Sequence, residues 1–221
     1  MISKGPEPAT DCPHCPRLVA FRNEQRKAEP GWHNAPVSSF SASKANGPVQ
    51  LLIVGLAPGL RGANRTGRPF TGDYAGDLLY PTLIDHGFAC GTYGATPDDG
   101  LELVNCRITN AVRCVPPQNK PIGAEIAACR DFLIGEIEFL RELHAILALG
   151  RIAHDAVLTS LGARRAAFPF SHGAVYDIGT RAVLVDSYHC SRYNVNTGRL
   201  TAEMFDAVVA QIRTQLDTSS T

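Results

Sequence analysis

The feature that most constrains the fold is a strand signal at residues 51–54 that leads directly into a basic, glycine-rich loop ending at residue 73. The run LLIV is apolar at every position, which is typical of a strand covered on both faces, as in a parallel sheet. Ligands of open α/β sheets bind at the carboxyl ends of strands, and glycine lets the backbone approach a ligand closely. The loop therefore predicts the floor of a binding site. It contains neither a P-loop nor a G-x-G-x-x-G fingerprint.

The side chains of this loop indicate the kind of ligand. Arg61, Arg65 and Arg68 fall in a stretch without an acid, and Phe70 and Asp73 follow. Cations, one aromatic ring and one carboxylate on a glycine scaffold favour a polyanion whose flat part is stacked and chemically attacked. Taken alone, the segment is better explained as a surface loop of solvated arginines, and the ligand-binding interpretation gains only when the other segments of the chain are added.

The bulk composition sets limits on partners and compartment. The chain has 221 residues, enough for one domain with a full core, and its 21 Lys and Arg balance its 21 Asp and Glu. A nucleic-acid partner must therefore be argued from local patches. The sequence has no apolar run of membrane length and no signal peptide, so we expect a cytoplasmic protein without a membrane partner, and a monomer by default.

Strand and helix patterns alternate along the rest of the chain. They predict an α/β fold: a single-domain, three-layer α/β/α sandwich with a central, mostly parallel sheet. We expect the domain to span residues 12–216, with a flexible N-terminus at 1–11 and a flexible tail at 217–221. Residues 116–121 predict a rigid proline loop. The predicted strands are 51–54, 106–115, 145–149 and 182–185, and the predicted helices are 18–27, 74–86, 126–143, 152–161 and 200–216.

The seven cysteines in such a compartment favour metal ligands or free thiols over disulfides. Cys12 and Cys15 form a C-x-x-C turn, which is half of a tetrahedral sulfur site. Cys114, at the end of a strand, and Cys129, on the following helix, are the best-placed partners. Zinc and an iron-sulfur cluster both fit this set and would pin the N-terminal segment to the domain, and four free thiols are the alternative. We assign no metal role to Cys90, Cys106 and Cys190.

Four segments together resemble the iron-sulfur enzymes of the uracil-DNA glycosylase superfamily. They are GLAPG with TGRPFTGD (55–59 and 66–73), TNAVRCVPPQNKP (109–121), the cysteines at 12, 15 and 129, and HCSRYNVNTGRLT (189–201). Ala57, where the related family 4 carries an acidic residue, and the NVNTGRLT ending resemble the family 5 branch. The resemblance extends from residue 12 to residue 200 and implies a [4Fe-4S] cluster on the four cysteines, with zinc as the alternative.

The resemblance also implies roles for the site residues of an enzyme that flips a damaged base out of the DNA stack. Gly55 and Ala57 would form part of the base pocket, and Phe70 would stack on the base. Asn110 would present its amide to the edge of the base. A buried core phenylalanine and a turn-forming asparagine are the alternative interpretations.

The resemblance assigns the bond-breaking chemistry to two residues. His189 would stabilise negative charge on the leaving base, and Asp73 would orient a water molecule or stabilise a cationic sugar. A structural histidine and a helix N-cap are the alternatives.

The family usually has proline where this chain has Cys190, which would loosen the loop that enters DNA. Tyr193 and Asn194 would reach the groove left by the base. The candidates for phosphate contact, each also compatible with a solvated charge, are Arg65, Arg68, Lys120, Arg192 and Arg199.

The sequence therefore predicts a monofunctional DNA repair glycosylase. It would hydrolyse the N-glycosidic bond of uracil in DNA, with hypoxanthine and other deaminated bases as further candidates, by water attack that leaves an abasic site. The cluster would be structural. One alternative is a non-catalytic DNA-binding or damage-sensing module with a structural metal site, and another is a redox protein that uses the cluster for electron transfer.

Overall fold

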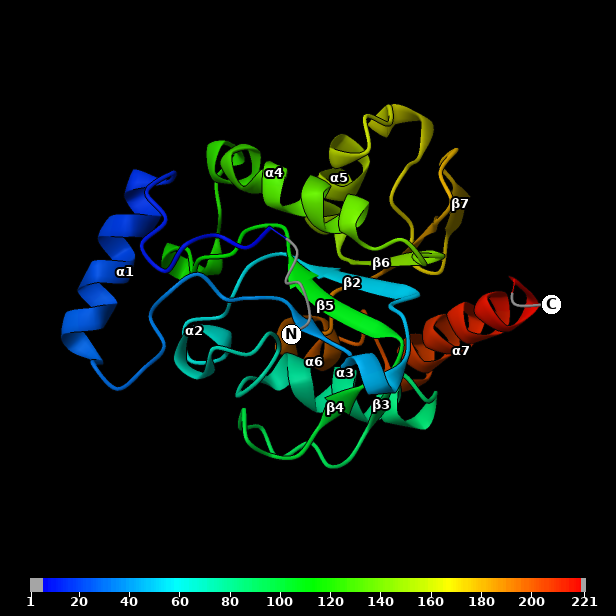
Figure 1. The fold of residues 1–221 in the computed structure, drawn as a ribbon, viewed down its shortest axis with the longest axis horizontal. Coiled ribbons are helices and arrows are strands. Elements are labelled where there is room, and N and C mark those ends of the chain that lie inside the picture. The colour runs from blue at the N-terminus through cyan, green and yellow to red at the C-terminus, as the bar shows by residue number, and fades with distance from the viewer. Residues whose placement is uncertain (1–5, 220–221) are drawn as a thin grey trace.

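The computed structural model describes residues 6–219 and contains a six-stranded sheet with strand order β1-β5-β2-β6-β8-β7 (Figure 1). The central strands β5, β2, β6 and β8 are parallel, and the short edge strands β1 and β7 are antiparallel to their neighbours. The predicted mostly parallel sheet is thus confirmed. The strands are β1 (Phe40–Ser41), β2 (Leu51–Gly55), β5 (Cys106–Asn110), β6 (Ala145–Leu149), β7 (Val175–Asp177) and β8 (Val183–Ser187), with a separate hairpin of β3 (Ala89–Cys90) and β4 (Glu102–Leu103).

Helices cover both faces of this sheet. In Figure 1, α4 and α5 lie on one face and α3 and α7 on the other. Among the described residues, none of the helices is long and apolar enough to cross a bilayer. The helices are α1 (Pro16–Ala28), α2 (Ala63–Thr66), α3 (Tyr74–Asp85), α4 (Gly123–Phe139), α5 (Arg151–Ser160), α6 (Arg192–Asn196) and α7 (Ala202–Ser219), and single 3-10 turns occur at Lys44–Asn46, Pro117–Asn119 and Arg165–Ala167.

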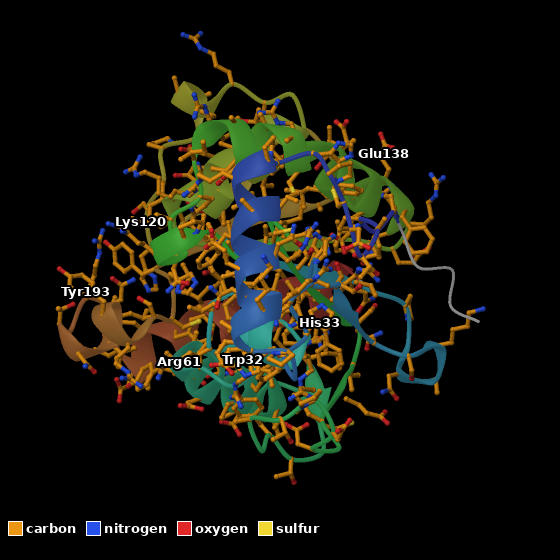
Figure 2. All side chains as sticks on the ribbon, turned by 90° about the vertical axis from the view of Figure 1, so that its left-hand side faces the viewer. Trp32, His33, Arg61, Lys120, Glu138 and Tyr193 are labelled. Carbon is orange, nitrogen blue, oxygen red and sulfur yellow. The ribbon has the colours of Figure 1, made fainter. Side chains whose placement is uncertain are left out.

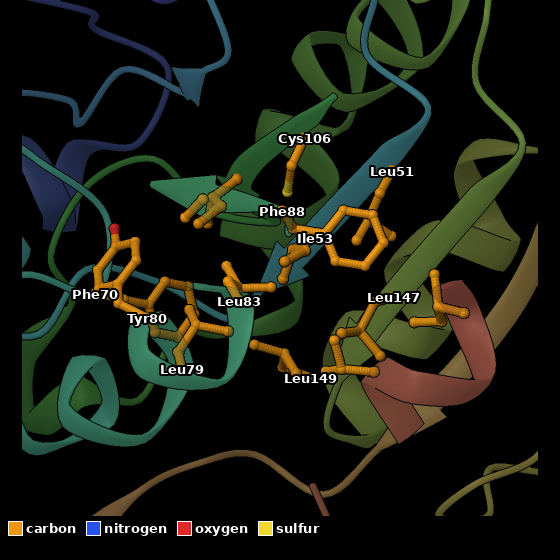
Figure 3. Close-up of a cluster of buried hydrophobic side chains, with 14 of the residues drawn as sticks. Leu51, Ile53, Phe70, Leu79, Tyr80, Leu83, Phe88, Cys106, Leu147 and Leu149 are labelled. Carbon is orange, nitrogen blue, oxygen red and sulfur yellow. The ribbon is translucent and has the colours of Figure 1, made fainter. Parts of the chain in front are cut away.

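The apolar run of β2 is buried because each face of the sheet has its own core. Leu51 and Ile53 point into the cluster shared with α3 and α7, which Figure 3 shows in close-up. Leu52 and Val54 point into the cluster shared with α4 and α5. Successive side chains of a strand face opposite sides, so a strand between two helical layers needs apolar residues at every position. The three-layer architecture is confirmed.

One predicted strand ends earlier than expected, and its end defines the site. The pattern predicted a strand over 106–115, whereas β5 ends at Asn110. The next two amides, of Ala111 and Val112, donate to the carbonyls of Gly55 and Leu56 at 2.9 and 3.0 Å. These bonds fix the end of β5 beside the beginning of the glycine loop.

The chain ends differ in part from the expected flexible segments. Residues 1–5 and 220–221 lie outside the described residues, and α7 continues through residues 217–219. In the segment 6–11, Glu7 forms ion pairs with Arg107 at 3.2 Å and with Arg113 at 3.0 Å. Both arginines also pair with the buried Glu136 of α4, at 2.5 and 2.7 Å. Residue 7 is thus held against the domain by a four-membered ionic network.

Candidate active site

A cavity of about 780 Å³ opens at the carboxyl end of the parallel strands and collects most of the predicted catalytic and substrate-binding residues. Such an edge is where open α/β sheets bind ligands. Another hollow, of about 510 Å³, is lined by residues such as Leu143, Ile146 and Ala182 at the amino ends of β6 and β8, and it contains none of the predicted site residues. The predicted residues that line the larger cavity are Ala57, Phe70, Asp73, Asn110, His189 and Arg192.

Gly55 is buried behind the cavity wall, where a side chain has no room. A Cβ at this position would lie 2.4 Å from Oδ1 of Asn110 and 2.5 Å from Cζ of Phe70. Gly55 and Asn110 are register partners at the ends of β2 and β5. The missing side chain therefore lets Asn110 and Phe70 meet at the end of two strands.

Phe70 belongs to the core and also lines the cavity. Its side chain is 6% exposed and packs in the cluster of Figure 3. Its φ of 52° lies in the left-handed region, which costs a non-glycine residue about 1 kcal/mol. The hydroxyls of Tyr80 and Tyr93 hold this turn by donating to the carbonyls of Pro69 and Phe70 at 2.5 and 3.3 Å. Both interpretations of Phe70, as a core residue and as a cavity residue, thus apply.

Asp73 is the N-cap of α3 and also lines the cavity. Its Oδ1 accepts a hydrogen bond from the amide of Ala75 at 3.2 Å. Burial raises the pKa of Asp73, although backbone amides at Ala75 and Gly76 act in the opposite direction. Its Oδ2 lies against the glycine loop. A Cβ added at Gly62 would be only 2.1 Å from this oxygen. The N-cap interpretation is therefore compatible with a role in the cavity.

Asn110 and His189 bring hydrogen-bonding atoms to the cavity. Asn110 is 4% exposed, and it lines the cavity at the end of β5. Nδ1 of His189 is buried without a hydrogen-bond partner among residues 6–219. Burial lowers the pKa of His189 to about 4, so the imidazole is neutral near pH 7 and offers one donor and one acceptor. Both side chains are available to a ligand in the cavity.

The loop after His189 is anchored to the core, contrary to the loosening expected from Cys190. The Cys190 side chain is fully buried in the same apolar cluster as Phe70. The side-chain amide of Asn194 donates to the His189 carbonyl at 2.8 Å, and the Ser191 hydroxyl accepts from the Asn194 amide at 3.4 Å at the start of α6. A buried thiol and two local hydrogen bonds thus hold the loop in place of the proline ring. Tyr193 of α6 is 73% exposed.

Several cavity residues were missed by the sequence prediction. Gly150, Arg151 and Ile152 line the cavity where β6 passes into α5. Their signal is the same strand-then-glycine pattern that singled out the end of β2. Asn119 also lines the cavity, and its side-chain oxygen accepts from the Leu60 amide at 3.3 Å, which joins the proline loop to the glycine loop.

Four of the five predicted phosphate contacts are exposed, and the fifth is not. Arg65 and Lys120 are exposed, and Figure 2 shows Lys120 on the same side of α1 as Arg61 and Tyr193. Arg192 and Arg199 are also exposed, and their guanidinium groups lie over the rings of Tyr74 and Tyr188 at 5.4 and 4.6 Å.

The prediction for Arg68 is wrong. Its side chain is buried, and its two terminal nitrogens donate to the two carboxylate oxygens of Asp99 at 2.8 and 2.7 Å. The guanidinium carbon also lies 5.2 to 6.0 Å from the ring centres of Phe40, Tyr80 and Tyr93. Arg68 therefore holds the loop of Asp99 against the domain, and its buried guanidinium is paired internally rather than presented to a phosphate.

The four predicted metal ligands meet at a second place, between α1, α4 and the segment after β5. Cys12, Cys15, Cys114 and Cys129 line one small enclosed hollow. Burial raises the pKa of the Cys15 thiol to about 11 and of the Cys114 thiol to about 12. Within residues 6–219, no group of three or more His, Cys, Asp or Glu side chains is arranged to hold a single metal ion. The remaining cysteines lie elsewhere: Cys90 is exposed, and Cys106 and Cys190 are in the sheet core.

Comparisons with known proteins identify the family of this chain. The family profile described as uracil DNA glycosylase superfamily matches residues 44–213. The chain is 45% identical to a type-5 uracil-DNA glycosylase of Thermus thermophilus, over 92% of this chain and 93% of that protein. It is 40% identical to a type-5 uracil-DNA glycosylase of Pyrobaculum aerophilum, over 90% and 86% of the two chains. A type-4 uracil-DNA glycosylase of Archaeoglobus fulgidus is 29% identical over 69% and 70%. The chain belongs to the uracil DNA glycosylase superfamily.

Proposed function

We propose that this protein is a monofunctional uracil-DNA glycosylase that removes uracil from DNA and leaves an abasic site. The observation that carries the proposal is the convergence of Phe70, Asp73, Asn110 and His189, from three separate segments, on one cavity of about 780 Å³. Family membership and the type-5 relatives support the same activity. We further propose that residues 12–216 form the catalytic domain and that a single copy acts on each lesion.

The proposed recognition step uses the ring of Phe70 and the side-chain amide of Asn110. A uracil flipped out of the duplex is flat and carries both donors and acceptors on its edge. The face of Phe70 would stack on the base, and its ring centre lies 5.9 Å from that of His189. The side-chain amide of Asn110, which lines the cavity, would donate to one edge atom of the base and accept from another. Other deaminated bases such as hypoxanthine share the amide-like edge and are further candidates.

The proposed chemical step breaks the bond between the base nitrogen and C1′ of the sugar. The electron pair of that bond goes to the base, so negative charge grows on the base and positive charge grows on the sugar. Neutral His189 would donate a hydrogen bond to the base anion, and Asp73 would face the cationic sugar. A water oxygen held by Asp73 then bonds to C1′ and releases a proton. The DNA strand itself stays intact.

The cavity mouth is suited to the phosphates that flank a flipped nucleotide. Three exposed arginines line the cavity: Arg61, Arg151 and Arg192. We propose that these three arginines contact phosphates together with Arg65, Lys120 and Arg199.

We also propose that the four converging cysteines bind a [4Fe-4S] cluster. The chemistry of the donor set fits, because thiolate ligands come from the start of α1, the segment after β5 and α4 around one enclosed hollow. Burial raises the pKa of the Cys15 and Cys114 thiols, and metal binding at these sulfurs would displace their protons. When bound, the cluster would supply a cross-link between three segments, and base hydrolysis needs no electron from it.

A labelled oligonucleotide with a single uracil tests the proposed activity. Strand cleavage is expected only after alkali treatment of the product, because the enzyme would leave an abasic site. Asp73→Asn and His189→Ala should each lower the rate of base release by about 100-fold or more while DNA binding stays within a few-fold. Asp77→Asn is the matched control, since Asp77 is exposed in the first turn of the same helix.

Two outcomes would overturn this assignment. Protein with an intact cluster that yields no alkali-sensitive product from uracil or hypoxanthine would favour the DNA-binding module. If both variants lose DNA binding as well as activity, Asp73 and His189 would act in DNA binding rather than in the chemical step.

A further inference from the structure

Arg22 of α1 is a buried cation without a carboxylate partner. Its side chain is 2% exposed, and among the described residues its bonds go to the Cys12 carbonyl, from Nη2 at 3.2 Å, and to Sγ of Cys114, from Nη1 at 3.6 Å. Its Nε is buried with no partner in the same part of the chain. The guanidinium keeps its positive charge in a protein interior.

The other buried arginines follow a different rule. Arg68 pairs with Asp99 at 2.7 Å, and both Arg107 and Arg113 pair with Glu136 at 2.5 and 2.7 Å. A buried charge without a counter-charge is strongly destabilising, and this is why these three arginines have acidic partners. The position of Arg22 therefore calls for an anion, because among the described residues its hydrogen bonds go to a carbonyl and a sulfur and not to a carboxylate.

The hollow beside Arg22 identifies that anion by its chemistry. Arg22 lines the hollow together with Cys12, Cys15, Cys114 and Cys129. Ligation of iron converts the four thiols to thiolates, whose summed charge outweighs that of the cluster core. The thiolate-ligated cluster is thus negative as a whole, and it would face the buried guanidinium.

We propose that Arg22 is the buried counter-cation of the cluster, holding it by charge and by hydrogen bonds to the ligand segments. This inference rests on the proposed cluster and adds a residue outside its ligand set. The bond to Cys114 places positive charge at a ligand sulfur, and the bond to the Cys12 carbonyl fixes the N-terminal turn. Residues that orient metal ligands in this way typically change metal affinity by about 10- to 100-fold.

Two further effects follow from the charge. A cation beside the cluster stabilises the more negative, reduced state, so removal of Arg22 should lower the reduction potential of the cluster. Removal of Arg22 should also speed the loss of iron to a chelator, because the cluster would then be a buried anion without a nearby cation.

The test compares Arg22→Gln, which removes the charge, with Arg22→Lys, which keeps it. Iron and acid-labile sulfide are measured on purified protein, followed by the rate of bleaching with an iron chelator and by a redox titration with dithionite. Arg22→Gln should lose its cluster about tenfold faster than wild type and have a lower potential, with Arg22→Lys between the two. Arg26→Gln is the control, because Arg26 lies one turn along α1 and pairs with Asp11 at the surface, at 2.7 Å.

Each outcome decides the inference separately from the glycosylase assignment. Equal cluster content, bleaching rate and potential in wild type and Arg22→Gln would overturn the role of Arg22 and leave the cluster itself in place. Wild-type protein without iron and sulfide would overturn both the cluster and the counter-cation. Uracil release is assayed independently and stands on the cavity residues. If Arg22→Gln does not fold, the test rests on the folded Arg22→Lys variant. A bleaching rate and a reduction potential equal to those of wild type in Arg22→Lys would count against the hydrogen-bonding part of the proposal.

Discussion

At the scale of single residues, Gly55 offers a test in which one methyl group reaches two site residues. A Cβ at this position would collide with Oδ1 of Asn110 and Cζ of Phe70, at 2.4 and 2.5 Å. We expect Gly55→Ala to reduce base release by about 100-fold, the effect typical of a displacement near 1 Å in an active site. Single-turnover assays with a uracil oligonucleotide measure this change.

The control for Gly55→Ala is Gly123→Ala. Gly123 is at the start of α4, and a Cβ there meets nothing within 4 Å. This variant should retain wild-type activity and stability. Unchanged activity in Gly55→Ala would mean that Asn110 and Phe70 can both move without affecting the reaction.

The charge state of His189 gives a second prediction at this scale. Burial lowers its pKa to about 4, below the ordinary value of about 6.5. The folded state therefore binds this proton less readily than the unfolded chain, and the neutral form stabilises the fold above about pH 6.5. That contribution is lost as the pH falls toward 4. Nuclear magnetic resonance of labelled histidines should show a His189 ring that does not titrate between about pH 6 and 8.

His189 also predicts the pH dependence of catalysis. If the neutral ring donates to the leaving base, no rate loss from this residue is expected between about pH 6 and 8. A His189 signal that titrates near pH 6.5, or a rate that requires the protonated ring, would contradict this view. If the rate does fall with pH because His189 titrates, His189→Ala should remove that limb of the pH–rate profile.

At the scale of secondary-structure elements, a buried histidine-aspartate pair joins α5 to β8. Nδ1 of His154 lies 2.7 Å from Oδ1 of Asp186, and its Nε2 lies 2.8 Å from the Phe168 carbonyl oxygen. Burial lowers the pKa of His154, but the bonds to Asp186 and Phe168 outweigh it, so the pKa is raised. Both partners accept hydrogen bonds, which favours the doubly protonated ring. Oδ2 of Asp186 also accepts from the Ser171 amide at 3.3 Å.

This pair predicts a stability that declines with rising pH. Because the folded pKa of His154 is raised, its contribution is fully present below about pH 6.5 and is lost as the pH rises through the folded value. Asp186→Asn should lower the free energy of unfolding by about 3 kcal/mol at pH 6. Urea titrations at pH 6 and pH 9 measure the difference, which should shrink at the higher pH. An equal loss at both values would show that His154 is neutral in the fold.

The sequence pattern predicted the buried strands of the sheet but not its short edge strands. The strands at 51–54 and 145–149 were predictable because burial on both faces requires apolar residues throughout. The edge strands β1 and β7 were missed, since two or three partly exposed residues give no periodic signal. The end of β6 was missed as a site segment although it shares the strand-then-glycine pattern of β2.

Individual charges were the hardest to predict, because their partners are far away in the sequence. Arg68 was expected to face DNA, but its acidic partner is Asp99, 31 residues later. Glu7 was placed in a flexible segment, whereas its partners are Arg107 and Arg113, 100 and 106 residues away. Local sequence does not distinguish a solvated charge from a paired one. Asp73 and His189 were found because each follows a glycine loop or strand end within a recognisable motif.

At the scale of the whole molecule, a formal net charge of zero hides an uneven distribution. The buried arginines Arg68, Arg107 and Arg113 are neutralised internally by Asp99, Glu7 and Glu136. The exposed cations at the cavity mouth, Arg61, Arg151 and Arg192, are left to act on a ligand. A neutral protein can thus bind a polyanion at one edge, and the binding should depend on salt.

Removing two of these cations gives a quantitative test of that edge. Each phosphate contact contributes about −0.9 to the slope of log K against log salt concentration on duplex DNA. The double variant Arg61→Gln/Arg192→Gln should make this slope less steep by about 1.8 and weaken binding equally to uracil-containing and undamaged duplexes, because phosphate contacts carry no base information. Fluorescence anisotropy over a range of salt concentrations measures both. The matched control is Arg141→Gln/Arg164→Gln, which removes the same charge from exposed positions outside the cavity and should leave the slope unchanged. Equal effects of the two double variants would mean that net charge, and not the cavity mouth, sets the affinity for DNA.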